Sequence, residues 1–196
     1  MDNIPLVIAS RNEGKIEEFK KLLKGFPLNL LIQPEDFEIE ETGKTFKENA
    51  RIKAVAVSKE TGNLSLADDS GLSVQVLGGA PGVYSSRYAK SDKERIEKLL
   101  AELKPFSNRK AKFECALCIA DGEKILVEVT GFCEGNITFS PRGKNGFGYD
   151  PIFEVFQLGE TFAEMNYDTK KFLGHRGNAF KLLKPELENL LNLIKY

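Results

Sequence analysis

The chain has 196 residues, of which 41% are hydrophobic and 29% are charged, a balance typical of a globular domain that excludes a disordered or fibrous protein. Its 28 basic and 29 acidic residues leave a net charge of −1, so no global field favours binding to nucleic acids or anionic membranes. The apolar runs are short, and we expect neither a membrane span nor a secretory leader. These features predict a cytoplasmic protein without a direct nucleic-acid or membrane partner.

The chain opens with a predicted strand, loop and helix. Residues 5–9 form a short apolar run that is typical of a buried strand. Apolar residues then recur at helical spacing from Ile16 to Phe26. The polar segment 10–15 lies between the two and offers a hydroxyl, an amide, a lysine and the backbone amides of a helix start, which suit a phosphate group. An ordinary helix start with an exposed lysine is the alternative.

A second helix is predicted from Thr45 to about Glu60. Thr45 and Glu48 fit a capping box, in which each side chain satisfies a backbone amide of the first turn, and Gly62 provides the stop. Lys53 falls on the apolar face of this helix. A lysine there is costly unless it is paired or bound to an anion, although its stem could also reach water.

Two adjacent acids follow the next predicted strand. Residues 64–67 are mostly apolar and predict a strand, which we expect to end in a turn at 68–71, where the sequence is Asp-Asp-Ser-Gly. Neighbouring carboxylates repel each other unless they share a divalent cation or a proton. Ligands also bind at the ends of strands in α/β sheets. The acidic pair therefore indicates a functional site, with an ordinary turn as the alternative.

The remaining elements are predicted from the same signals. In chain order they are a glycine-rich loop at 77–84, a capping-box helix from Ser91 through Leu103, a β-hairpin of 110–120 and 124–133, a second glycine-rich loop at 141–150, a short strand around 152–153, and two helices, 178–183 and 186–195, separated at Pro185. Strands and helices are mixed and one strand pair is antiparallel. The pattern predicts one α/β domain over residues 1–196, with a mixed β-sheet and flanking helices.

Two polar groups in the second half are candidates for binding a base. In the second glycine-rich loop, Phe147 or Tyr149 could stack on a flat ligand and Asp150 could accept from its ring nitrogens, or the two aromatic rings could pack in the core. His175 is the single histidine and precedes Arg176, a setting that suits an anion or a carbonyl oxygen better than a nucleophile's base. A polar loop histidine is the alternative.

The three cysteines are predicted to be reduced packing residues. Cys115 and Cys118 have the spacing of a metal-binding pair, but they lie in an alternating strand, where residues three apart point to opposite faces. Cys133 stands alone, and no second pair or nearby histidine completes a zinc site.

Taken together, the polar segments resemble the inosine triphosphate pyrophosphatase family, whose members remove dITP, ITP and XTP. The resemblance covers Ser10–Phe180 and rests on six blocks in the family's order: S-x-N-x-x-K, E-T-G-x-T-F-x-E-N-A-x-x-K-A, A-D-D-S-G-L, L-G-G-x-P-G-x-Y-S-x-R-Y-A, G-F-G-Y-D-P-I-F and H-R-G-x-A. It implies an elongated, two-lobed mixed α/β fold with a central nucleotide cleft, a homodimer, and hydrolysis to the monophosphate and pyrophosphate with Mg²⁺.

The resemblance also implies roles for particular residues. Those expected at the phosphates are Ser10, Asn12, Lys15, Lys53 and Arg87. The metal carboxylates are Glu41 and Asp69, with Asp69 also the catalytic base. Ser70 contacts substrate. Those expected at the base and sugar are Phe147, Gly148, Tyr149, Asp150, Lys170, His175 and Arg176. The chain departs from the family pattern at Gly174, where Ser is common, and at Lys171, where Asn is common.

Two other interpretations are compatible with the sequence. A Maf-type pyrophosphatase would use a similar fold on modified pyrimidine nucleotides, and a nucleotide sensor would bind without cleaving. The acids Glu41, Asp68 and Asp69 argue against a sensor, because binding alone would not place carboxylates beside phosphates.

Overall fold

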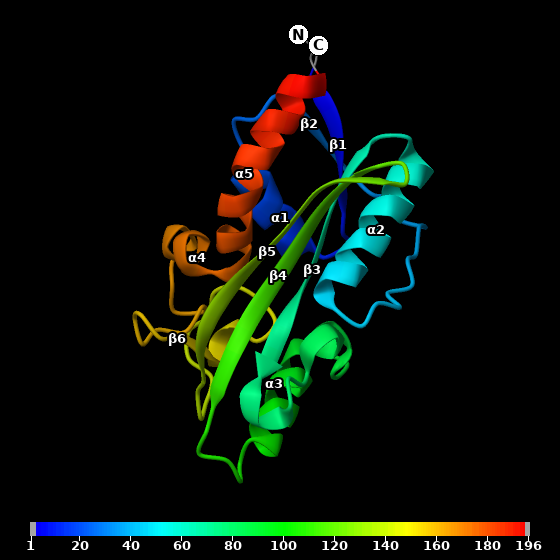
Figure 1. Cartoon of the computed structure of the whole chain (residues 1–196). Helices are drawn as coiled ribbons and strands as arrows, with labels where there is room; N and C mark the ends of the chain where they lie inside the picture. Colours follow the sequence, from blue (N-terminus) through cyan, green and yellow to red (C-terminus); the bar gives the residue numbers. More distant parts are fainter. Residues whose placement is uncertain (1–2, 195–196) are drawn as a thin grey trace. The chain divides into compact units, whose positions relative to one another are not determined.

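A computed structural model describes residues 3–194 (Figure 1). The helices and strands are, in chain order, β1 (Ile4–Ala9), α1 (Glu13–Leu22), β2 (Leu28–Ile32), α2 (Phe46–Thr61), β3 (Leu64–Val74), α3 (Asp92–Glu102), β4 (Lys110–Asp121), β5 (Lys124–Ile137), β6 (Phe153–Val155), α4 (Tyr167–Leu173) and α5 (His175–Ile194). Short 3-10 helices occupy Gln75–Leu77, Gly82–Arg87 and Asp150–Ile152. Within residues 3–194, none of the helices combines the length and apolar composition that a bilayer crossing requires.

The strands form one mixed sheet in the order β2-β1-β3-β4-β5-β6. β1 pairs in parallel with both β2 and β3, whereas β5 pairs antiparallel with β6. β4 and β5 are neighbours joined by a turn at Gly122, whose positive φ of 55° suits glycine. The predicted mixed α/β fold and hairpin are confirmed.

The chain divides into two compact units. The first unit comprises the residues up to Asp69, Ala116–Thr130 and the residues from Ala179 onward. The second unit comprises Ser70–Cys115 and Gly131–Asn178. The chain therefore passes from one unit to the other inside β3, between two residues that were both predicted to belong to the site.

The first unit is built on the apolar strand β1. Its residues 6–9 are almost fully buried, as the sequence predicts. α1 contributes its apolar stripe but ends at Leu22, so Phe26 lies beyond the helix and packs edge-on against Phe180 of α5 with ring centroids 6.2 Å apart. Figure 1 shows α5 beside α1. The edge strand β2 was not predicted, because its half-exposed sequence lacks a clear alternation.

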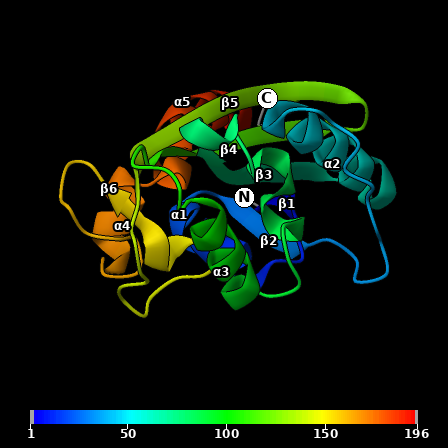
Figure 2. The same ribbon diagram turned by 90° about the horizontal axis from the view of Figure 1, so that it is seen from below.

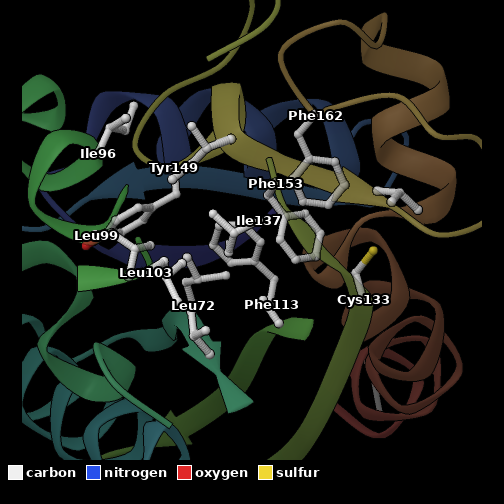
Figure 3. Close-up of a cluster of buried hydrophobic side chains, with 14 of the residues drawn as sticks. Leu72, Ile96, Leu99, Leu103, Phe113, Cys133, Ile137, Tyr149, Phe153 and Phe162 are labelled. Atoms are coloured by element: carbon white, nitrogen blue, oxygen red, sulfur yellow. The ribbon is translucent and has the colours of Figure 1, made fainter. Parts of the chain in front are cut away.

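The second unit contains a cluster of buried side chains drawn in Figure 3. The rings of Phe113, Phe153 and Phe162 meet in it, with centroid distances of 4.7 to 5.6 Å. Tyr149 lies in the same cluster, near Leu99 of α3. In Figures 1 and 2, α4 follows β6 on the same side of this unit. The segments that carry the base-binding candidates therefore rest on a packed aromatic core.

Three local predictions are wrong. The expected turn at 68–71 is absent, because β3 continues through it to Val74. The expected break at Pro185 is also absent: α5 is one helix, and its buried stripe continues across the proline through Ala179, Phe180, Leu183, Leu187 and Leu191. Ser91 caps α3 as predicted, but Glu94 accepts from the amide of Lys90 rather than completing a capping box. Lys195, the predicted end of the last helix, lies outside the described residues.

The capping box of α2 is confirmed. The Thr45 hydroxyl accepts from the Glu48 amide at 3.1 Å, and the Glu48 carboxylate accepts from the Thr45 amide at 3.2 Å. Gly62 closes the helix in the left-handed region with φ 63°. The helix that carries Lys53 is thus fixed at both ends.

We expect Thr45→Ala to lower the free energy of unfolding by about 1 kcal/mol, because one helix amide loses its partner. Urea unfolding followed by circular dichroism measures this change. Thr45→Ser is the matched control: it keeps the hydroxyl and should remain close to the wild-type value. Equal losses in both variants would contradict a capping role.

Candidate active site

The first unit gathers the predicted metal and phosphate residues around Lys53. The Nζ atom of Lys53 lies 2.7 Å from Oε1 of Glu41 and 3.3 Å from Oδ1 of Asp69. Glu41 comes from the loop before α2, Lys53 from α2 and Asp69 from β3. Lys53 and Asp69 are buried, and Glu41 is partly buried. Two carboxylates from separate segments therefore converge on one cation.

A second ion pair lies beside this group. The Nζ atom of Lys15 is 2.9 Å from Oδ1 of Asp68, whose side chain is fully buried. Successive side chains of a strand point to opposite sides, and Asp68 and Asp69 accordingly take different lysines. The adjacent acids are thus separated by the strand rather than by a turn, and each has its own ammonium group.

Burial and charge shift the pKa values of the central pair. Burial raises the pKa of the Asp69 carboxyl above its ordinary value, and the nearby Lys53 and Lys15 only partly oppose this. Burial alone would lower the pKa of Lys53, but the surrounding carboxylates, led by Asp69, outweigh it and raise that pKa. Lys53 is therefore protonated at neutral pH, while Asp69 binds a proton more readily than an exposed aspartate.

The segment before α1 forms a tight polar cap. The Ser10 hydroxyl accepts from the Asn12 amide at 3.2 Å, and Oδ1 of Asn12 accepts from the Lys15 amide at 3.1 Å. Asn12 is the N-cap residue of α1. The predicted phosphate segment therefore is a helix N-terminus with a lysine one turn in, a setting that favours anions.

Asn49 joins the same group and was not singled out from the sequence. Its Nδ2 donates to Oδ2 of Asp69 at 3.1 Å, and its Oδ1 accepts from the amide of Gly43 at 2.8 Å. Asn49 is fully buried. The available signal was its position one helical turn before Lys53, which places both polar residues on the inward face of α2.

The second unit gathers the predicted base-binding residues around Asp150. Its Oδ2 accepts from the amide of Phe147 at 2.9 Å and lies 2.7 Å from Nζ of Lys170. The same ammonium lies 5.1 Å from the centroid of the Phe147 ring. Gly146 has φ +78°, and a Cβ there would lie 1.9 Å from Oδ2 of Asp150. The loop thus needs glycine at this position to wrap around the carboxylate.

His175 and Arg176 lie at the start of α5 and are both buried. The imidazole of His175 stacks on Phe113, with centroids 4.6 Å apart and an angle of 12° between the planes. Nη2 of Arg176 donates to Oγ of Ser70 at 3.0 Å. The structure therefore brings two predicted substrate residues, Ser70 and Arg176, into direct contact.

The other candidates of the second unit differ in their surroundings. Tyr149 is buried in the core cluster, and its hydroxyl donates to the carbonyl of Ser85 at 2.9 Å. The amide of Gly148 donates to Oδ2 of Asp92 at 2.7 Å. Arg87 is exposed at the end of the 3-10 helix Gly82–Arg87. Of the two aromatic candidates, Phe147 is the more accessible and Tyr149 supports the loop.

The acidic group supplies fewer ligands than a complete metal cage. Among residues 3–194, no three side chains of His, Cys, Asp or Glu are grouped so that they could hold a metal ion. Glu41 and Asp69 nevertheless place one oxygen each within 3.3 Å of a single nitrogen. Two carboxylates fit Mg²⁺, which in nucleotide sites takes one or two carboxylates and completes its shell with phosphates and water.

The cysteines take no part in this chemistry. In the described part of the chain, all three are buried and form no disulfide. Burial raises the pKa of the Cys118 and Cys133 thiols to about 12, so neither is a reactive thiolate at neutral pH. The prediction of packing residues is consistent with both observations.

Comparisons with known proteins show which family the chain resembles. A family model described as the Ham1 family matches residues 6–186. A dITP/XTP pyrophosphatase of Prochlorococcus marinus (strain NATL1A) is 77% identical, with 100% of each chain covered, and one of Synechococcus sp. (strain CC9311) is 62% identical, with 97% of this chain and 93% of the relative covered. The solved structure of a HAM1 protein from Coxiella burnetii has a TM-score of 0.88 at 43% identity, covering 95% of this chain and 99% of that one.

The raised pKa of Asp69 predicts how the stability of the protein depends on pH. A carboxyl group with a raised folded-state pKa favours folding when it is protonated, and this contribution disappears as pH rises through the raised value. At pH 7 in cation-free buffer, Asp69→Asn should therefore unfold at the same or a higher temperature than wild type. The higher unfolding temperature of Asp69→Asn should vanish below pH 3.8, the ordinary pKa of an aspartate.

Thermal unfolding across pH measures this difference. Asp121→Asn is the matched control, because Asp121 is an exposed acid of the same unit and should show no such crossover. If Asp69→Asn instead unfolds at a markedly lower temperature at pH 7, the ion pair with Lys53 stabilises the fold by more than the burial of the carboxylate costs.

Proposed function

The chain belongs to the Ham1 family, and we propose that it hydrolyses deaminated purine nucleoside triphosphates, namely dITP, ITP and XTP, to the monophosphate and pyrophosphate. The enzyme is a nucleoside triphosphate pyrophosphatase, as the names of its full-length relatives indicate. Such an activity removes damaged nucleotides from the cellular pool.

The observation that carries this proposal is the convergence of Glu41 and Asp69 on the ammonium of Lys53. It supports a centre in which carboxylates and a lysine share one small volume, as a reaction at a phosphate with a divalent ion requires. The neighbouring Lys15 and the N-terminus of α1 add positive potential on the same unit.

We assign magnesium to the two carboxylates of Glu41 and Asp69. Bound magnesium supplies charge neutralisation on the phosphates and acidifies water in the site. The residues of the chain do the rest: Lys15 and Lys53 hold phosphate oxygens and offset the charge that develops on the leaving pyrophosphate. Asp69 takes a proton from the attacking water, a role that suits a carboxyl with a raised pKa.

Base recognition is assigned to the group around Asp150. Phe147 offers a ring for stacking on a purine, and Lys170 and Asp150 offer a donor and an acceptor next to it. Inosine and xanthine carry an oxygen at C6 where adenine carries an amino group. Donors from Lys170, His175 or Arg176 would pair with that oxygen and would be left unpaired against adenine.

A homodimer and a cytoplasmic location remain predictions. The buried thiols support a reducing compartment, because cysteines of cytosolic proteins stay reduced. The mass of the purified protein measured by light scattering decides the oligomeric state. We expect twice the chain mass of 21.9 kDa.

A pyrophosphate-release panel over common and deaminated nucleotides, with and without Mg²⁺, tests the proposed function. We expect release from dITP, ITP and XTP with Mg²⁺, and little release from ATP, dTTP or UTP. Asp69→Asn should abolish turnover, whereas the exposed-site control Asp121→Asn should not change it. Turnover of dTTP and UTP in preference to dITP would support a Maf-type enzyme, and tight ITP binding without release would support a sensor.

His175 provides a separate test of base selection. His175→Phe keeps a ring that can stack on Phe113 but removes the N–H donor, whereas His175→Gln keeps a donor and removes the ring. An unpaired buried donor costs about 1–3 kcal/mol. We therefore expect His175→Phe to narrow the ratio of kcat/KM for ITP over ATP about tenfold to a hundredfold, with a smaller change in His175→Gln. Equal losses on both nucleotides in His175→Phe would restrict His175 to packing.

A further inference from the structure

We propose that Asn49 is a positioning residue that fixes the carboxylate of Asp69 relative to the loop that carries Glu41. The inference rests on the proposed function, because it assigns a task to Asn49 within that same site. Asn49 itself is not expected to touch the nucleotide: it is fully buried, and both ends of its amide are already bonded to the protein.

The two hydrogen bonds determine which way the amide points. The amide of Gly43 can only donate, so it must face Oδ1 of Asn49, at 2.8 Å. The carboxylate of Asp69 can only accept when ionised, so it must face Nδ2, at 3.1 Å. One side chain therefore joins a loop donor to a strand acceptor. Among residues of this size, only asparagine has one donor end and one acceptor end.

The two oxygens of Asp69 consequently have different tasks. Oδ2 is held by Asn49, while Oδ1 faces Lys53 at 3.3 Å, on the side where Glu41 also approaches that ammonium. A carboxylate held at one oxygen loses its rotational freedom, so the other oxygen is kept in place for the proton or the metal. Such preorganisation lowers the cost of reaching the reactive geometry.

The loop before α2 is bound to the start of the helix by three consecutive amides. Gly43 donates to Asn49, and Lys44 and Thr45 both donate to the carboxylate of Glu48. Gly43 lies so close that a Cβ there would be 2.6 Å from Oδ1 of Asn49 and 2.7 Å from Cβ of Glu48. Glu41 is only two residues earlier, so the capped helix start acts as the rigid support for this metal carboxylate.

Two substitutions separate the two bonds. Asn49→Asp keeps an oxygen that can accept from Gly43 but replaces the donor to Asp69 by a second carboxylate. Asn49→Leu has a similar size and removes both bonds. Ser58→Ala is the matched control: Ser58 is also buried on α2, and its hydroxyl makes two bonds, to the carbonyl of Asn63 at 2.7 Å and from the amide of Gly122 at 2.8 Å. It has no contact with the site.

Steady-state kinetics on dITP is the first measurement. We expect both Asn49 variants to lose about 10- to 100-fold in kcat, as is typical when a supporting partner of a metal ligand is removed, with KM changed by less than about threefold. Ser58→Ala should keep a wild-type kcat even where its unfolding temperature falls as far. Wild-type kcat in folded Asn49→Asp, or an equal fall in Ser58→Ala, overturns the proposal.

Hydrogen exchange of the Gly43 amide is the second measurement, and it does not depend on activity. We expect exchange about threefold to tenfold faster in Asn49→Leu, because a net hydrogen bond is lost, and wild-type exchange in Asn49→Asp. Unchanged exchange in Asn49→Leu overturns the tether to the loop. If wild type fails to hydrolyse dITP, ITP and XTP, the proposed function fails, while the exchange data still decide whether Asn49 holds the loop. If Asn49→Leu does not fold, Asn49→Asp alone decides the kinetic part.

Discussion

The ammonium of Lys53 between the carboxylates of Glu41 and Asp69 is the interaction on which the candidate site of the first unit depends. Burying either carboxylate alone would be costly, and burying the lysine alone equally so. Together they become tolerable only if the helix that carries Lys53, the strand that carries Asp69 and the loop that carries Glu41 are held in a fixed arrangement. The capping box of α2, the parallel pairing of β1 with β3 and the Asn49 amide all contribute to that arrangement. Local features that stabilise a helix or a sheet therefore also hold these three charged side chains in position.

The second unit also stabilises a buried carboxylate, and it uses the same kinds of partner. The buried carboxylate of Asp150 is balanced by Lys170 and by a backbone amide, as Asp69 is balanced by Lys53 and by the Asn49 amide. What differs is the surrounding surface. Aromatic rings surround the Lys170 ammonium, which lies over Phe147 and Phe162, whereas the Lys53 ammonium is surrounded by carboxylates. An aromatic setting suits a purine ring, and an ionic setting suits a triphosphate.

The sequence predicted those features that depend on local physics. The first strand, the capped helix α2 and the hairpin follow from apolar periodicity, a capping pair and a turn, and the motif blocks identified the family.

Features that depend on tertiary contacts could not be predicted from local sequence patterns. Residues 68–71 have strong turn propensity, yet β3 continues because its neighbours and two lysines stabilise an extended chain with buried acids. Pro185 lies inside a helix because the apolar stripe on both sides is buried together. For Asn49 the sequence offered only its spacing of one helical turn from Lys53, because its role depends on bonds to Gly43 and Asp69 that form only in the folded chain.

The geometry of β3 explains the adjacent acids Asp68 and Asp69 more specifically than their mutual repulsion does. Because neighbouring residues in β3 point to opposite sides, Asp68 and Asp69 are not two ligands of one ion but the acids of two separate ion pairs. Asp68 positions Lys15, and Asp69 faces Lys53 and Glu41. Three carboxylates then stand against two ammonium groups, so the cluster is net negative before any ligand arrives. A site built only to bind a triphosphate would have the opposite sign. The excess of acid supports the proposal that a cation enters with the nucleotide.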